Sequence, residues 1–493
     1  MIPTPFLRSP PFPGIAASLA AVSVMRETGD GAAPVGDDVL EAIVAARVGG
    51  AFWGARPGEP RRSDRAESDP WALVASVQSI HAQADDDVAL IAGLLGVSVI
   101  GPDGAVIDAG QLRASLKARI AAARYRDCFT GAPVDAMQAV TQLADWRRHI
   151  DGNRGIVAAS GMAFWKRDAI RHFLWDGIAS PPFLSADRGL RRARREQGAL
   201  AVWPSRVPVA LPQDAAGQGV ALARVEDGFL RSRGLGAALH PPGSVVVDRT
   251  GIYYNARAAN DLETLLATHD FPPALVDRAR RLRERVCATG VTKYGPEAGQ
   301  MIDLPAGGRT VLAIGQVDDD LSVRVRRAEP DAWIVYRPHP DVQAGHRKGH
   351  LPDSVVLAHA DAIDSGAPLM ELVQAVDELH VLSSLTGFEA LMRGRSVTVH
   401  GMPFYAGWGL TRDLAQPCVR RGRQLTVDQL VAAALILYPR YLDPVTRLPC
   451  GPEIMVDRMA DGSTPPMTWL IALRALQGKF RRFMTLSAEF LHG

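Results

Sequence analysis

The stretch VLAIGQVDDDLS, residues 311–322, places four apolar residues directly before a polar segment with three aspartates. A short apolar run of this kind is typical of a strand buried on both faces of a parallel sheet. Further runs follow, with helical stretches such as MELVQAV and TGFEALMR between some of them. They are AWIVYRPH (332–339), SVVLAH (354–359), DELHVLS (377–383) and VTVHG (397–401). This alternation predicts a parallel sheet with helices on both faces.

A second series of apolar runs precedes the first and is separated from it by the turn PAGG, residues 305–308. Its expected strands are ALAVW (199–203), GVALARVED (219–227), SVVVD (244–248) and GIYYN (251–255). Two such series predict an α/β protein with two Rossmann-like lobes, residues 151–305 and 306–460. Because ligands of such sheets bind outside the carboxyl ends of the strands, the site is expected there.

The composition excludes several classes of protein. A chain of 493 residues with 47% apolar and 22% charged residues is typical of a globular protein of two to four domains. Its formal net charge of +2 provides no field that would attract nucleic acid. The four cysteines form no CxxC pair, which argues against a zinc ribbon and favours a reducing compartment. Sequence motifs of P-loop NTPases, zincins and serine hydrolases are also absent.

Two terminal segments bear on localisation. The apolar run GIAASLAAVSV, residues 14–24, is too short to span a bilayer, so we expect a cytoplasmic protein without a transmembrane helix. Residues 461–493 include PMTWLIALRALQGKFRRFMTL (466–486), which predicts a basic amphipathic helix. Such a helix either packs on its own domain or lies on an anionic membrane surface.

Several short motifs occur twice in a common order. RYRDCFTGAP (124–133) and RYLDPVTRLP (440–449) share Arg, Tyr, Asp, Thr and Pro at identical spacing. Weaker pairs are AFWGARP (51–57) with AVWPSRVP (201–208), each expected to contain a strand, and VSVIGPDG (97–104) with VTVHGMPF (397–404). We interpret the chain as two copies of one module. Residues 1–150 would be a degenerate, truncated copy, and the second copy would carry the chemistry.

Two clusters of carboxylates follow expected strands. Glu226 and Asp227 precede a glycine and are followed by Arg231, which suits acid/base chemistry or acceptor binding, or else forms a plain surface turn. The aspartates at 318–320 repel one another, which favours a solvated turn, a metal site or a catalytic site. No second acidic cluster accompanies them to complete a magnesium site, so we expect one of them to act directly.

Phosphate-binding groups are expected after the next strand. Arg337 and His339 flank a proline, which fixes the backbone at the strand end. A histidine that titrates near neutral pH beside an arginine suits a phosphate whose departure needs a proton. The alternative for His339 is a hydrogen bond to a turn carbonyl.

A further polar group opens a helix. Ser383, Ser384 and Thr386 precede TGFEALMR, and the first amides of a helix form a phosphate site. Glu389 lies three residues after Thr386, so it either closes a capping box or binds two ribose hydroxyls.

The stretch HGMPFYAGWGLTRD, residues 400–413, fits neither a regular helix nor a regular strand, and the first copy lacks it. Since a core plug would be needed in both copies, we interpret this stretch as a ligand loop with glycine-permitted turns. Its expected contact residues are Phe404, Tyr405, Gly407 and Trp408. The alternative is that these aromatic side chains seal the two lobes.

Eight motifs occur in one order between roughly residues 120 and 460: EDGFLRSRGLG, DRTGIYYN, TKYG, GQVDDDLS, YRPHPDV, SSLTGFEALMRG, GMPFYAGWGLTRD and YPRYLDPVT. Together they resemble the capsule polysaccharide synthesis proteins that build the β-Kdo linker of group 2 type capsules in Gram-negative bacteria. The resemblance implies a retaining, metal-independent β-Kdo glycosyltransferase of the GT-B fold that uses CMP-β-Kdo and no cofactor. Its acceptor would be a lipid-linked oligo-Kdo chain in capsule biosynthesis and export. Its other partners would be the inner face of the cytoplasmic membrane and further capsule assembly proteins.

The resemblance also implies roles for individual residues. In the family's QxxxD pattern, counted from Gln316, the nucleophile matches Asp320, and Asp319 is the second candidate. Nucleotide binding is implied for Gln316, Arg337, His339, Ser383, Ser384, Thr386 and Glu389, with His339 helping the nucleotide to leave. Glu226 and Asp227 would face the acceptor, one of them as general base. Arg231, Tyr405 and Trp408 would line the cleft.

The first copy departs from the family's pattern, because no EDGF, QxxxD or HP motif occurs before residue 150. We therefore expect a single transferase activity, with residues 151–305 on the acceptor side and residues 306–460 on the nucleotide-sugar side. Two alternatives stay open at this point: a nucleotide-sugar epimerase on the same fold, and a non-catalytic subunit of capsule assembly.

Overall fold

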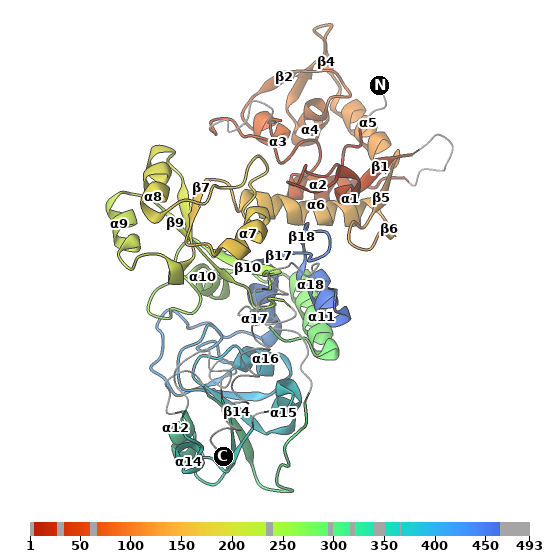
Figure 1. The fold of residues 1–493 in the computed structure, drawn as a ribbon. Helices are drawn as coiled ribbons and strands as arrows, with labels where there is room; N and C mark the ends of the chain where they lie inside the picture. Colours follow the sequence, from red (N-terminus) through yellow and green to blue (C-terminus); the bar gives the residue numbers. More distant parts are fainter. Residues whose placement is uncertain are drawn as a thin grey trace, which may run out of the picture. The chain divides into compact units, whose positions relative to one another are not determined.

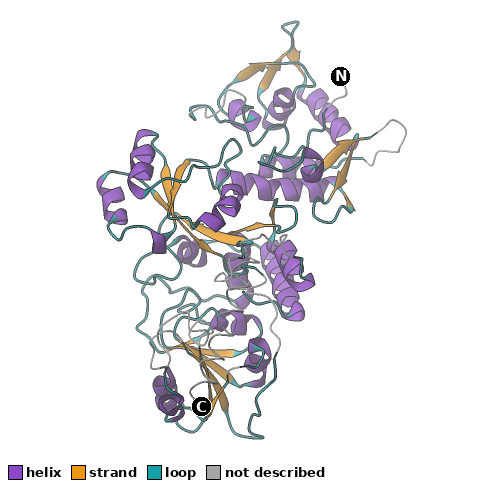
Figure 2. Cartoon of the chain, viewed as in Figure 1, coloured by secondary structure: helices purple, strands orange, loops and turns teal. Residues whose placement is uncertain are grey.

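The computed structural model describes residues 4–26, 34–59, 67–232, 240–293, 299–315, 321–338, 351–364 and 366–463. The chain divides into two compact units. Unit 1 comprises Met1–Ala221 and Arg440–Ile454, and unit 2 comprises Leu222–Pro439 and Met455–Gly493. Helices and strands alternate in both, which confirms the predicted α/β class (Figures 1 and 2). Among the residues that the structure describes, no helix is long and apolar enough to cross a membrane.

A six-stranded parallel sheet forms the core of unit 2, as VLAI and the following apolar runs predict. Its strands are β11 (Thr310–Ile314), β12 (Trp333–Arg337), β13 (Ala362–Ile363), β14 (Glu378–Val381), β15 (Ser396–Val399) and β16 (Arg412–Asp413). Their order is β13-β12-β11-β14-β15-β16. The chain thus starts in the middle, moves to one edge, and then returns to build the other half. This is the doubly wound order of a Rossmann sheet.

Helices cover both faces of this sheet. The connection from β11 to β12 runs through α12 (Leu321–Ala328), and the connection from β14 to β15 runs through α16 (Thr386–Met392). Because parallel crossovers are right-handed and the two connections advance in opposite directions, α12 and α16 lie on opposite faces. On the α12 face, Val311 and Ala313 of β11 pack with Leu321 and Val325, all of them fully buried.

Unit 2 contains further helices. They are α10 (Asp261–Thr268), α11 (Pro273–Thr289), α14 (Asp353–Leu357), α15 (Leu369–Ala375) and α17 (Val427–Val431), and a π-helical segment (Ala432–Leu437) continues α17. The helix α18 (Pro452–Asp461) spans the boundary residue between the two units.

Two expected strands of unit 2 are wrong. SVVLAH forms the helix α14, and the strand at this edge is β13 instead. Val356 is buried against the α12 layer in this helix. A short apolar run looks alike in a buried strand and a buried helix, so periodicity could not separate them. GIYYN forms turns because Asp248 accepts hydrogen bonds from the amides of Thr250 (3.0 Å) and Gly251 (2.6 Å), which bend the chain after β10.

The first two strands of unit 2 pair antiparallel, whereas a parallel arrangement was expected. They are β9 (Leu222–Asp227) and β10 (Ser244–Asp248), with Glu226 opposite Val246 and Arg224 opposite Asp248. Val245 and Val246 are fully buried, as the apolar run SVVVD predicts. The antiparallel register places the carboxyl end of β9 beside the start of β10.

Unit 1 contains short sheets and several helices. A parallel pair joins β7 (Ile156–Ser160) to β8 (Ala199–Val202), and two three-stranded sheets have the orders β1-β5-β6 and β2-β3-β4. The remaining bounds are α1 (Ala17–Ala20), β1 (Ser23–Met25), α2 (Asp37–Ala46), α3 (Pro70–Val74), β2 (Ser79–His81), α4 (Asp87–Leu95), β3 (Ser98–Ile100), β4 (Val106–Ile107), α5 (Ala109–Ala121), β5 (Ala123–Arg126), β6 (Pro133–Val134), α6 (Ala136–Asp151), α7 (Arg167–Phe173), α8 (Ala186–Arg195), α9 (Leu211–Gly217), β17 (Pro439–Leu442) and β18 (Pro449–Cys450). AFWGARP, in contrast to its expected strand, forms turns.

The repeated RYxDxxT box has the same structure in both places. Residues 124–133 form the antiparallel hairpin β5–β6, and residues 440–449 form the hairpin β17–β18. In each, the aspartate accepts hydrogen bonds from the following turn amides, and the residue four places after it has a positive φ (Gly131, 75°; Arg447, 64°). This shared geometry supports the proposed repeat. The boundaries of the truncated copy stay a prediction.

Candidate functional site

Two of the polar motifs predicted from the sequence follow, along the chain, the two strands between which the unit 2 sheet reverses its winding. Both β11 and β14 end at this switch point, and residues 315–320 and 382–386 follow them directly. Ligands of doubly wound sheets bind at this place because the two crossovers leave a crevice between them. Gly315 packs so closely there that a Cβ would lie 2.2 Å from Tyr336 Oη.

Arg337 is the last residue of β12 and is held firmly at this edge. Its Nη1 donates to Asp364 Oδ2 (2.7 Å) and to the Ala367 carbonyl (2.5 Å). Asp364 is fully buried and also accepts the Ala367 amide (3.0 Å). The register places Arg337 opposite Ile314, the last residue of β11. The backbone of Arg337 thus lies beside the end of β11, and its guanidinium is held by the segment that follows β13.

The SSLTG segment forms a tight turn into α16. The Thr386 amide donates to Ser384 Oγ (3.3 Å), and Ser384 Oγ donates to Thr386 Oγ1 (3.1 Å). The helix has Leu385 as its N-cap, and no side chain caps it. Of the two interpretations of Glu389, the one in which it closes a capping box with Thr386 is therefore wrong.

Glu389 joins two segments of unit 2 instead. It is 6% exposed, and its Oε1 accepts the Lys293 amide (2.9 Å) from the TKYG motif. The Lys293 carbonyl in turn accepts the Arg231 amide (3.1 Å). Ribose binding by Glu389 stays a prediction, and the structure adds a positioning contact that sequence spacing did not indicate.

The two carboxylates at the end of β9 differ in their surroundings. Asp227 Oδ2 accepts Nε of Arg231 (2.9 Å), whose side chain is 1% exposed. The same guanidinium donates to Ser232 Oγ (2.7 Å) and to the His240 carbonyl (3.0 Å). Arg231 is thus a buried structural cation for Asp227, whereas Glu226 Oε1 accepts the Asp227 amide (3.1 Å).

The loop HGMPFYAGWGLTRD is packed into unit 2. Tyr405 and Trp408 are fully buried, Tyr405 Oη donates to the Ser384 carbonyl, and Trp408 Nε1 donates to the Phe404 carbonyl (2.8 Å). Phe404 stacks on Phe229 with ring centroids 4.7 Å apart. This burial favours a packing role for these aromatic side chains; that they seal the two lobes stays a prediction. Ligand contact by Tyr405 and Trp408 stays a prediction. Through the Tyr405 hydroxyl, the loop also holds the SSLTG turn in place.

A buried ion-pair cluster fixes the same loop, and sequence reasoning missed it. Arg421 donates to Glu263 Oε2 (2.8 Å) and to the Ala406 carbonyl (3.1 Å), and Arg420 donates to Glu263 Oε1 (2.5 Å). Burial by itself would raise the pKa of Glu263, but the hydrogen bonds from both arginines outweigh it and lower that pKa. No local pattern pairs a helix residue of α10 with an arginine so distant in sequence.

Several predicted residues lie outside the described residues. They are Gln316, Asp319 and Asp320 of the QVDDD motif, His339, and the basic C-terminal segment from residue 464 onward. Their roles stay predictions. Gly315 and Leu321, which the structure describes, flank the QVDDD residues in the sequence. Arg337 lies two residues before His339.

One acidic cluster of unit 2 has the ligand types of a metal site. Glu329, Glu378 and His380 offer three atoms within 4.8 Å of one another. However, Arg412 donates to Glu329 Oε1 (2.7 Å), and Arg309 pairs with both Glu329 (3.3 Å) and Glu378. The arginines already neutralise these carboxylates, so a divalent cation would have to compete with them. Glu378 also begins β14, whereas the predicted site follows the last residue of that strand.

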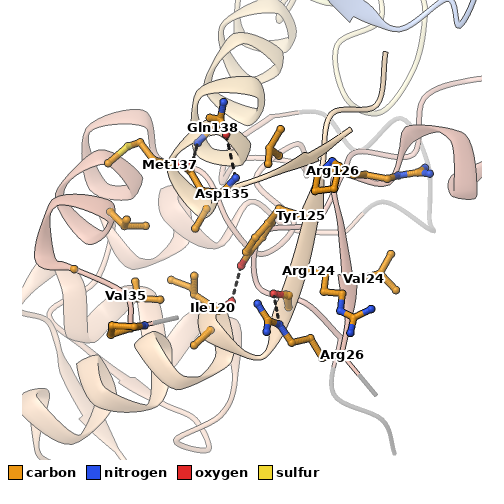
Figure 3. A pocket seen from close by; sticks show the side chains of 18 of the residues that line it. Val24, Arg26, Val35, Ile120, Arg124, Tyr125, Arg126, Asp135, Met137 and Gln138 are labelled. Carbon is orange, nitrogen blue, oxygen red and sulfur yellow. Dashed lines mark hydrogen bonds between the residues drawn. The ribbon is translucent and has the colours of Figure 1, made fainter. Parts of the chain in front are cut away.

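A cavity of about 950 Å³ lies in unit 1, away from these motifs (Figure 3). Its wall includes Tyr125 of the first RYxDxxT box, whose hydroxyl donates to the Ile120 carbonyl (2.8 Å). Arg26 and Pro34, which also line it, flank residues 27–33, which the structure does not describe. We place the candidate site at the switch point instead, because Arg337 and the SSLTG turn follow the two strands that flank β11 there.

The fold and the site define a class: an α/β protein whose doubly wound sheet presents arginine, serine and threonine side chains at its switch point, as nucleotide-binding sheets do. The capsule polysaccharide biosynthesis protein family matches residues 198–295 and 293–441. The lipopolysaccharide-processing protein LpsZ of Rhizobium meliloti is 38% identical over 312 residues, which cover 58% of this chain and 70% of LpsZ. The chain therefore belongs to the capsule polysaccharide biosynthesis protein family, as its motifs predict.

Other relatives extend this similarity. The capsule polysaccharide modification protein LipA of Neisseria meningitidis serogroup A is 36% identical over 339 residues, or 66% of this chain and 48% of LipA. The chain thus spans about half the length of LipA. Among solved structures, the β-Kdo 2,4 transferase of Thermosulfurimonas dismutans KpsC is 31% identical with a TM-score of 0.53, covering 62% of this chain and 98% of its own. The β-Kdo 2,7 transferase of the same KpsC is 29% identical with a TM-score of 0.52, covering 63% and 100%.

Proposed function

We propose that this protein is a retaining β-Kdo glycosyltransferase that moves Kdo from CMP-β-Kdo to a Kdo-terminated glycolipid in capsule biosynthesis. The observation that carries the proposal is the switch point of unit 2, where Arg337 ends β12 and the SSLTG turn follows β14, the two strands that flank β11. This region falls within the stretch that the family model matches. The similarity to the two KpsC β-Kdo transferases supplies the sugar and the reaction type.

On the donor side, the proposal assigns the nucleotide to residues at the carboxyl edge of the sheet. Arg337, fixed by Asp364, pairs with the phosphate of CMP. Ser383, Ser384 and Thr386 offer hydroxyl groups to the same phosphate, and Glu389 takes the ribose. His339 donates a proton to the departing phosphate. In this scheme the cations and hydroxyl groups of the chain stabilise the leaving group, and no metal or cofactor is required.

Retention of configuration follows from two successive displacements. First, the Asp320 carboxylate attacks the anomeric carbon, the bond to the phosphate oxygen breaks, and CMP leaves with the electron pair. Then the acceptor hydroxyl attacks the same carbon, its proton passes to a general base, and Asp320 departs. We assign the general base to Glu226, because Asp227 is committed to the buried cation of Arg231.

A single activity fits the contrast between the two copies of the repeat. In the first copy, β2, α4 and β3 follow one another as β14, α16 and β15 do in unit 2. The helix α4 begins with Asp87, which pairs with Arg8 (3.1 Å) and Arg119 (3.0 Å), where α16 begins with Thr386. An acidic helix start repels phosphate. We therefore propose a scaffold role for the first copy and cytoplasmic action at the inner membrane surface for the whole protein.

The proposal is tested by incubation with CMP-Kdo, generated in situ, and a Kdo-terminated acceptor. Transfer should yield a β-linked product and CMP, measured by chromatography and NMR. Asp320→Asn should abolish transfer, and mass spectrometry of the wild type should detect a Kdo adduct on the peptide that holds Asp320. Asp331→Asn, a change at an exposed aspartate, serves as the charge-matched control and should leave transfer intact.

Three outcomes would contradict the proposal or part of it. An adduct on another peptide would move the nucleophile. An α-linked product would refute retention. An epimerised nucleotide sugar without transfer would establish the epimerase instead.

A further inference from the structure

One face of β9 carries two charged side chains that point the same way. Arg224 and Glu226 are two residues apart, so both project from the same face of the strand, and each is half-buried. The intervening Val225 is fully buried on the other face. In the antiparallel register, Arg224 lies opposite Asp248 and Glu226 opposite Val246. The proposed general base thus has a cation as its neighbour on the strand.

The chain after β10 folds back over this region. Asp248 is fully buried and accepts the Thr250, Gly251 and Asp261 amides as well as the Tyr438 hydroxyl (2.8 Å). Arg224 Nη1 adds a bond to the Thr250 carbonyl (3.3 Å). These contacts anchor the DRTGIYYN motif to the end of β10, although neither the motif nor its tyrosines has a role in the donor site.

The two tyrosines of that motif have opposite environments. Tyr253 packs edge-on against Phe229 (4.8 Å between centroids) and against Phe404 (6.0 Å) inside the aromatic cluster of unit 2. Its neighbour Tyr254 contacts it edge-on (5.3 Å) but is 52% exposed. A buried anchor beside an exposed ring holds that ring in a set orientation. Large exposed aromatic side chains held in this way are typical of binding sites.

Both charged residues on this face of β9, Arg224 and Glu226, influence the pKa of Tyr254. Partial burial raises the pKa of its phenol, the Glu226 carboxylate raises that pKa further, and Arg224 opposes the rise. The phenol therefore stays protonated at neutral pH and is a hydrogen-bond donor. The Arg224 bond to the Thr250 carbonyl ties the charged face of β9 to the segment that carries Tyr254.

We propose that Tyr254 and Arg224, beside Glu226, form the subsite for an acidic sugar at the end of the acceptor. The Tyr254 ring packs on the apolar face of the pyranose, and the Arg224 guanidinium pairs with the sugar carboxylate. This holds the attacking hydroxyl near Glu226, which takes its proton. The inference rests on the proposed transferase function and adds to it the residues that select an anionic acceptor over a neutral one.

The Arg224 guanidinium is the group that makes this subsite selective for an acidic sugar. An aromatic ring stacks on neutral and acidic sugars alike, whereas a guanidinium distinguishes a carboxylate from a hydroxymethyl group by charge and by paired hydrogen bonds. The two side chains therefore make separable predictions. Loss of the ring weakens every acceptor, and loss of the cation removes the preference for the acidic one.

The test uses the full chain, an acidic acceptor ending in Kdo, and the same acceptor with its carboxyl group reduced to an alcohol. For Tyr254→Ala we expect the KM of both acceptors to rise about tenfold, and for Tyr254→Phe a change of about threefold or less. For Arg224→Gln we expect the ratio of kcat/KM between acidic and reduced acceptor to fall about tenfold. Arg257→Gln, at an exposed arginine of the same loop, is the matched control and should change neither value.

Direct binding separates the subsite from the reaction. Saturation-transfer NMR with the acidic acceptor alone should report binding to the wild type and a loss of signal in Tyr254→Ala, while circular dichroism confirms that both are folded. If the wild type binds the acidic acceptor but never turns over CMP-Kdo, the proposed function fails and the subsite stands. If Tyr254→Ala and Arg224→Gln bind and discriminate as the wild type does, the subsite is refuted.

Discussion

Single residues decide how closely the candidate site can pack. A Cβ at Gly387 would lie 2.3 Å from Tyr405 Oη, so the first turn of α16 leaves room for the tyrosine only because residue 387 is glycine. The same hydroxyl holds the Ser384 carbonyl. Glycine, tyrosine and serine thus form one unit, although they belong to two motifs that are separate in the sequence.

Glu378 supplies a prediction about pH at the residue scale. Hydrogen bonds from His380, Thr398 and Arg309 outweigh burial and lower the pKa of this carboxyl to about 2 from its usual 4.5. A carboxyl whose pKa is lower in the folded state stabilises that state above pH 4.5 and loses this contribution as the pH falls toward 2. At about 1.4 kcal/mol per pH unit, the whole network contributes on the order of 3 kcal/mol.

We therefore expect Glu378→Gln to lower the free energy of unfolding at pH 7, with the difference from the wild type shrinking below pH 4.5. Urea unfolding followed by circular dichroism at pH 7, 4.5 and 3 measures it. Glu371→Gln, at an exposed position in α15, is the control and should be neutral at each pH. A difference that grows as the pH falls would contradict the assignment.

The repeated hairpin is the clearest case at the scale of one element. In β17–β18, the fully buried Asp443 accepts the amides of Val445 (3.2 Å) and Thr446 (3.0 Å) and the Thr446 hydroxyl (2.7 Å). In β5–β6, the half-buried Asp127 accepts the amides of Phe129 (2.7 Å) and Thr130 (3.0 Å). The box repeats because the turn needs an acceptor at this position.

We expect Asp443→Ala to lower the free energy of unfolding by about 2–3 kcal/mol and Asp127→Ala by about 1 kcal/mol, since an unsatisfied amide costs more where water cannot replace the lost acceptor. Chemical denaturation of both variants measures the two changes in the free energy of unfolding, and each variant serves as the comparison for the other. The reverse order would show that burial does not govern the cost of this turn.

Elements also show where sequence patterns reach their limit. VLAI, AWIVY and DELHV become strands as predicted, because continuous burial on both faces demands apolar residues at every position. SVVLAH becomes α14, since four apolar or small residues are compatible with either conformation until the neighbouring layer is known. The capping box, one of the two alternatives for Glu389, does not form, and the carboxylate accepts the Lys293 amide from a segment nearly a hundred residues away.

At the scale of the whole molecule, residues before 150 contribute to the core of unit 1. Trp146 of α6 is fully buried, its Nε1 donates to the Pro449 carbonyl (2.6 Å), and its ring meets Phe12 edge-on (4.9 Å). Residues before 150 thus hold the hairpin that closes the second copy. A chain cut at residue 150 would lose this contact, whether or not the first copy takes part in catalysis.

We expect Trp146→Ala to lower the free energy of unfolding of unit 1 by about 3–5 kcal/mol, as is usual for a buried tryptophan. Differential scanning calorimetry should show the loss in one transition. Trp333→Ala, at a partly exposed tryptophan of unit 2, is the control and should cost clearly less. Equal losses would indicate that the first copy contributes no more to stability than a surface side chain.

The sequence alone determined the α/β class, the parallel strands of unit 2, the polar residues at their carboxyl ends and the family. The α/β class and the strands depend on local periodicity and composition, which each segment carries by itself, whereas the family follows from the resemblance of eight motifs in their common order. Only the tertiary structure decided that β9 and β10 pair antiparallel, that Tyr405 and Trp408 are buried, that Asp227 is held by Arg231, and that Tyr254 is exposed beside Arg224 and Glu226. Each of these features depends on which segments, distant in the sequence, pack against one another. Burial and ion pairing arise from that packing, and no single segment determines them.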